Sequence, residues 1–159
     1  MNRIRRYIRM LTIFTKRAGY VRGDYLKKIG YFKKQGEHCY FQPWNFGTDP
    51  YLISFGNNVH VASNVTFINH DITSLMFRYT DGNHTYKERQ GEIIIGDNVF
   101  IGTNTTILYD VTIGNNVIIG AGSLVCKDIP SNVVAAGNPC KVIGDYNTYK
   151  EKITRKNLT

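Results

Sequence analysis

The chain has 159 residues, of which 42% are hydrophobic and 13% aromatic, as expected of one globular domain large enough to bury its own core. No apolar run approaches the length needed to span a bilayer, and the basic N-terminus lacks the apolar run and cleavage site of a secretory signal, so a cytoplasmic protein is expected. The net charge of +8 comes from residues 1–34, which hold 11 of the 20 Lys and Arg and one acid, so it is poor support for nucleic-acid binding.

The first 34 residues predict a basic helical segment. Apolar residues recur there at helical spacing, with arginines between them: Ile4, Tyr7, Ile8, Leu11 and Phe14. Glycines at 19, 23 and 30 then predict a break into short pieces. Such a helix can pack on the rest of the molecule, lie on an anionic membrane surface, or remain a solvated arm.

A six-residue repeat begins at Phe55, in "FGNNVH", "VASNVT" and "FINHDI". It stops at the polar cluster Asn69, His70 and Asp71. Residues 73–91 lack the repeat and are polar toward their end, which predicts a loop excursion from one corner. Long loops on a rigid scaffold are commonly functional.

The repeat resumes in "IGDNVF", "IGTNTT", "ILYDVT", "IGNNVI", "IGAGSL" and "VCKDIP", from Ile95 onward. An aliphatic residue opens each hexad, and the fifth position is small or β-branched. A period of six fits no helix but preserves the strand period of two, so short strands joined by sharp corners are expected. The sequence therefore predicts an all-β solenoid, a parallel β-helix with one inward side chain per hexad. Residues 145–159 predict a polar tail.

The hexads, followed by "IPSNVVAAGNPCKVI", resemble the hexapeptide-repeat acyltransferases, and most of all their sugar O-acetyltransferase group, over roughly residues 48–144. The resemblance implies a left-handed parallel β-helix over residues 35–144, a homotrimer with sites between subunits, and acetyl-CoA as the acyl donor. It implies a sugar, nucleotide-sugar or lipid-linked glycan acceptor in polysaccharide or lipopolysaccharide biosynthesis. The protein is expected in the cytoplasm, where peripheral contact with the inner membrane surface is open to it.

His70 occupies the position of the family's general base. Imidazole suits this role because it exchanges protons near neutral pH. Asp71 or a backbone carbonyl is expected to orient the ring, and Asp49, Asn69 and Asp71 are the expected acceptor contacts. His84, in the loop, is a rival base. Without the resemblance, "NHD" can equally be an ordinary surface turn, because Asn, His and Asp are common in turns.

The resemblance also implies a coenzyme A path lined by small residues and reached by cations. Lys127 and Lys141 are the expected phosphate partners. Gly144 stands where relatives often carry a basic residue. The other expected contacts are Gly102, Thr103, Gly120, Ala121 and Cys126.

Other functions remain open alternatives. An amino-sugar N-acetyltransferase or a xenobiotic acetyltransferase uses the same donor, and a non-catalytic solenoid would only bind partners. A zinc enzyme of the γ-carbonic anhydrase type is not expected, because the histidines at 38, 60, 70 and 84 lack its paired spacing. Trp44 is a candidate aromatic wall for a sugar, or a core residue.

Overall fold

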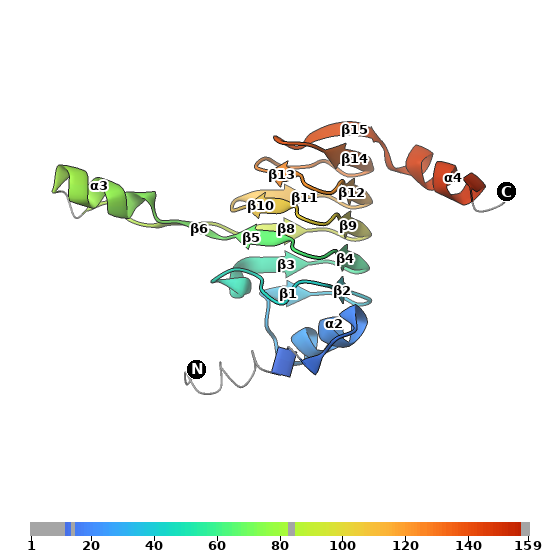
Figure 1. The fold of residues 1–159 in the computed structure, drawn as a ribbon, viewed down its shortest axis with the longest axis horizontal. Coiled ribbons are helices and arrows are strands. Elements are labelled where there is room, and N and C mark those ends of the chain that lie inside the picture. The colour runs from blue at the N-terminus through green and yellow to red at the C-terminus, as the bar shows by residue number, and fades with distance from the viewer. Residues whose placement is uncertain (1–11, 14, 83–84, 157–159) are drawn as a thin grey trace.

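The computed structural model describes residues 12–13, 15–82 and 85–156, and it shows a parallel β-solenoid (Figure 1). Short strands stack coil on coil, a long arm projects from one side, and a helix stands at each end of the stack. Within the described residues, no helix is long and apolar enough to cross a membrane.

Three sheets form the solenoid walls. Sheet A has the order β1–β3–β8–β11, with bounds Lys34–Gln35, Ile53–Phe55, Ile93–Ile95 and Val111–Ile113. Sheet B has the order β15–β14–β12–β9–β4–β2, with bounds Lys141–Asp145, Val133–Ala136, Val117–Ile119, Val99–Ile101, Val59–Val61 and Tyr40–Phe41. Sheet C has the order β13–β10–β5, with bounds Leu124–Val125, Thr106–Leu108 and Thr66–Ile68. All pairings between these strands are parallel except that of β14 with β15.

Strand register fixes the coil length. Ile107 pairs with Val125, 18 positions later, so a regular coil comprises three hexads. The same Ile107 pairs with Phe67, 40 positions earlier, so the coil between them is longer by 22 residues. The excess is the arm, and the solenoid resumes its register after it.

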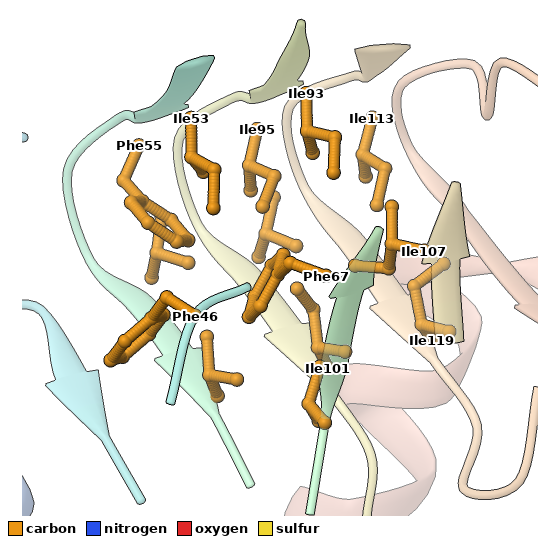
Figure 2. Close-up of a cluster of buried hydrophobic side chains, with 14 of the residues drawn as sticks. Phe46, Ile53, Phe55, Phe67, Ile93, Ile95, Ile101, Ile107, Ile113 and Ile119 are labelled. Atoms are coloured by element: carbon orange, nitrogen blue, oxygen red, sulfur yellow. The ribbon is translucent and has the colours of Figure 1, made fainter. Parts of the chain in front are cut away.

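Two side chains per hexad point into the core, not the one predicted (Figure 2). The opening aliphatic residue and the fifth residue flank each turn, so they belong to neighbouring strands and both face inward. Ile101 and Val117, for example, are 0% exposed. Thr105 and Ser123 occupy the fifth position as well and donate to the Gly120 carbonyl, which satisfies their buried hydroxyls.

Asparagines at one corner of the solenoid form a ladder along its axis. Asn58, Asn98, Asn116 and Asn132 adopt left-handed φ angles of 54–65°, which asparagine tolerates better than other residues with a Cβ. Each side-chain amide donates to the oxygen of the next, at 2.9, 3.0 and 2.8 Å. The repeated Asn therefore supplies both the turn and a contact between coils.

An α-helix caps the first coil where the sequence predicted short pieces. Helix α2, Gly19–Lys28, begins at the first of these glycines and continues through Gly23 without a break, so the break predicted at Gly23 was wrong. A Cβ at Gly23 would lie 2.3 Å from the Cys39 carbonyl oxygen, so this glycine permits close packing on the solenoid. Gly30, at φ +59°, is the residue that ends the helical region. The amphipathic pattern of residues 4–14 lies almost wholly outside the described residues.

The predicted loop contains regular structure. Strands β6, His70–Asp71, and β7, Arg89–Gln90, pair antiparallel and carry helix α3, Thr73–Asp81, away from the solenoid. The predicted polar tail is likewise helical, as α4, Tyr146–Lys156. A short 3₁₀ turn, Pro50–Leu52, precedes β3.

Candidate active site

His70 lies where the solenoid gives way to the arm, two residues after β5. Its Nδ1 donates to the Asp49 carboxylate at 2.9 Å, and Thr48 Oγ1 lies 3.0 Å from the same nitrogen. The side chains of His70 and Asp49 are 25% and 17% exposed. A carboxylate on Nδ1 selects the tautomer whose Nε2 carries the lone pair, so Nε2 is the atom able to accept a proton.

Asp71, the predicted partner of the imidazole, has other partners. Its carboxylate accepts from the Thr73 backbone N–H at 2.8 Å and from the Tyr109 hydroxyl at 3.2 Å. The Thr73 hydrogen bonds hold the pKa of Asp71 below its usual value, with Tyr109 and Arg89 adding to the effect. Asp71 therefore anchors the root of the arm, and Asp49 takes the orienting role that the sequence analysis gave to Asp71 or a carbonyl.

A cleft of about 330 Å³ lies beside the imidazole, lined by Thr48, Ile68, His70 and Ile72 among others. Asn69 lies beneath it at 1% exposure, and neither of its amide atoms is hydrogen-bonded to any described residue. An acceptor contact for Asn69 stays a prediction. His84, the rival base, lies outside the described residues.

The residues expected to contact coenzyme A fall on two corners of the solenoid. Gly102, Thr103, Gly120 and Ala121 follow β9 and β12 and stack on one another, since a Cβ at Gly102 would lie 2.5 Å from the Ala121 nitrogen. Cys126 follows β13, on the other side of sheet C, the side that also carries His70. A strand of three residues, roughly 10 Å, separates the two corners on one chain.

The two expected phosphate partners are exposed. Lys127 follows Cys126 at the corner after sheet C. Lys141 pairs with Ala136 in the β14–β15 ladder, and Ala136 packs against Gly120 at the opposite corner. Gly144 lies in β15 opposite Val134 and offers no cation. Within the described part of the chain, no cluster of His, Cys, Asp and Glu is arranged to hold a metal ion.

Sequence reasoning missed several residues at this site. Thr48 precedes Asp49 in "GTDP", and it lies close to His70 because the neighbouring Asp49 is hydrogen-bonded to the imidazole. Tyr109 lies one coil beyond Ile68 and touches Asp71 only because the coils stack. Asp49 also faces Tyr51, whose pKa it raises by charge repulsion of the phenolate.

The comparisons with known proteins identify the family. The model "Bacterial transferase hexapeptide (six repeats)" matches residues 92–127. Protein CapG of Staphylococcus aureus is 44% identical over 135 residues, which cover 82% of this chain and 74% of CapG. The chain therefore belongs to the hexapeptide-repeat acyltransferases.

Two solved structures place it within that family. A galactoside acetyltransferase in complex with coenzyme A matches with a TM-score of 0.60 and 29% identity, over 91% of this chain and 82% of that one. A maltose O-acetyltransferase from Clostridium difficile 630 matches with a TM-score of 0.54 and 32% identity, over 79% of this chain and 74% of that one. Both structures are sugar acetyltransferases, and this chain is an acyltransferase of their group.

Proposed function

We propose that the protein transfers an acetyl group from acetyl-CoA to a sugar hydroxyl, with His70 as the general base. The hydrogen bond from His70 Nδ1 to Asp49 carries this proposal, because it leaves Nε2 to accept the hydroxyl proton. The sugar oxygen attacks the thioester carbonyl carbon and the carbon–sulfur bond breaks. The coenzyme A thiolate then takes the proton from the imidazolium.

The division of the coenzyme A residues between two corners supports a homotrimer with sites between subunits. On one chain, sheet C separates His70 and Cys126 from Gly102 and Ala121. If one corner of each subunit faces the other corner of its neighbour, the base and the small residues line one groove. The left hand of the solenoid, expected from the family, belongs to the same proposal.

A panel assay tests the proposed reaction. The full chain is incubated with acetyl-CoA and with neutral sugars, nucleotide sugars and amino sugars, and thiol release is measured. Mass spectrometry identifies the product, and its cleavage by mild alkali distinguishes an O-acetyl ester from an N-acetyl amide. An alkali-stable product would favour the N-acetyltransferase alternative.

The polysaccharide or lipopolysaccharide pathway remains part of the proposal, as does contact between the basic N-terminus and the inner membrane surface. Sedimentation of the full chain with vesicles of anionic and of neutral lipid tests the contact. Binding to anionic vesicles that salt abolishes supports it. Equal recovery in the supernatant with both vesicle types contradicts it.

A further inference from the structure

The first coil lacks a strand beside β5. Sheets A and B begin with β1 and β2, but sheet C begins one coil later, at β5. Residues 42–49 pass beside β5 as irregular backbone. Pro43 has no N–H to donate, and Gly47 adopts φ +81° with its N–H bonded to Asn45 Oδ1 at 3.0 Å. Gly47 packs closely against the Phe67 carbonyl, and the ring of Phe46 stacks on the ring of Phe67.

This irregular segment leaves a hollow of about 470 Å³ between itself and the corner after β4. Trp44 and Asn45 line one side, and Ser63, Asn64 and Thr66 line the other. The last three are exposed, so their hydroxyl and amide groups face the solvent in the hollow. No residue lining the hollow is charged.

The indole of Trp44 is held in place from behind. The guanidinium of Arg22 lies 3.6 Å from the ring centroid. Arg22 itself is 1% exposed and donates to the carbonyls of Phe41 and Gln42, at 2.5 and 2.7 Å. A fixed cation therefore covers one side of the ring, while 37% of Trp44 remains exposed.

An aromatic face edged by amides and hydroxyls suits a neutral sugar ring. The C–H face of a pyranose stacks on an aromatic ring, and its hydroxyl groups pair with amides and hydroxyls. A nucleotide diphosphate would call for a cation or a cluster of free N–H groups at its phosphates. The uncharged lining thus favours a neutral glycan over a nucleotide sugar.

The hollow adjoins the cleft at His70. Phe67 contributes to both, and the neighbouring outward residues of β5 divide between them, Thr66 to the hollow and Ile68 to the cleft. Two residues along a strand span roughly 7 Å. We infer that the hollow is a second sugar subsite, which binds a neutral ring next to the one acetylated at His70. The inference rests on the proposed function and specifies its acceptor as a neutral oligosaccharide.

Trp44 is the one tryptophan of the chain, so its fluorescence reports on this subsite without any turnover. The full chain is titrated with neutral monosaccharides and disaccharides of glucose, galactose and N-acetylglucosamine, in the absence of acetyl-CoA. A saturable change in emission is expected with at least one disaccharide. Tyr149→Ala, at an exposed aromatic of α4 far along the chain from the hollow, should give the same titration as the parent.

Kinetics with the variants provide the second measurement. Trp44→Ala is expected to raise KM for a disaccharide acceptor roughly tenfold more than KM for the matching monosaccharide. Trp44→Phe should restore most of the difference because it keeps an aromatic face. Tyr149→Ala, an exposed aromatic of α4, is the matched control. Melting curves confirm that each variant folds.

The two measurements separate the subsite from the proposed reaction. If a sugar changes the Trp44 fluorescence but no acetyl group is transferred, the subsite is supported and the O-acetyltransferase assignment is contradicted. Acetyl transfer to a sugar that leaves the emission and the Trp44→Ala KM unchanged overturns the subsite alone. Emission unaffected by every neutral saccharide, with nucleotide sugars as the preferred acceptors, also overturns it.

Discussion

At the scale of single residues, the proposed base and its partner come from the start and the end of one coil. Asp49 precedes His70 by 21 positions, with β3, β4 and β5 between them. The adjacent carboxylate, Asp71, turns instead toward Thr73 and Tyr109. Proximity in sequence is therefore a poor guide to which acid orients the imidazole.

Substitutions at these three positions test the assignment. His70→Ala is expected to lower turnover by about a hundredfold or more, the usual contribution of a positioned base. Asp49→Asn should give a smaller loss, since it removes the charge that selects the tautomer, and Asp71→Asn the smallest. Steady-state rates with a common acceptor measure all three. A larger loss from Asp71→Asn than from Asp49→Asn would restore the sequence-based assignment.

His60 gives a pH dependence to stability. It lies on the outer face of β4, stacked on Tyr40 with ring centroids 5.6 Å apart, and burial lowers its pKa below the usual value. The unfolded chain therefore binds this proton at a higher pH than the folded chain does, and stability falls as pH drops below about 6.5.

The expected result is a melting temperature that decreases as pH is lowered from about 7 toward 5, with a shallower decrease in His60→Gln. Asp71 and Asp145 have lowered pKa values, so their contributions to stability are lost only at more acidic pH. A change in melting temperature between about pH 7 and pH 5 is therefore assigned to the histidine. Parallel slopes for parent and variant would exclude His60 as the source.

At the scale of elements, glycines determine how α2 meets the solenoid. Gly19 faces the ring of Tyr40, and Gly23 faces the backbone carbonyl of Cys39. A side chain can move aside, whereas a carbonyl within a coil cannot do so without displacing the coil.

Gly23→Ala should therefore destabilise the protein by about 1–3 kcal/mol, despite the better helix propensity of alanine. Gly19→Ala should cost less, because the Tyr40 ring can shift. Urea unfolding measures both. If Gly23→Ala proves as stable as the parent, α2 is packed more loosely than the contacts indicate.

The elements also show how far sequence reasoning reaches. The hexads predicted the stacked strands because Ile101, Val117 and their equivalents repeat one local rule. The helical path of α2 was missed because the contacts of Gly23 lie 16 residues away, at Cys39. The Asp49–His70 bond was missed for the same reason. Periodic contacts could be predicted, and contacts between irregular segments could not.

At the scale of the whole molecule, one chain carries two halves of the expected coenzyme A groove on different corners. We expect a trimer by light scattering at micromolar concentration. Acetyl-CoA should raise the melting temperature, because a ligand of the native state stabilises it by mass action. A monomer mass, or a melting temperature unchanged at millimolar acetyl-CoA, would contradict the proposed groove.

The two ends of the solenoid differ from its interior coils in ways that oppose end-to-end association of chains. A parallel β-stack offers unpaired edges at both ends, and each edge is a template for another chain. At one end, β15 runs antiparallel and is exposed along its length, so a further parallel coil does not continue the pattern. At the other, Arg22 donates to the carbonyls of Phe41 and Gln42, which an added coil would otherwise bond. The buried cation behind Trp44 therefore also acts as a stop against filament growth.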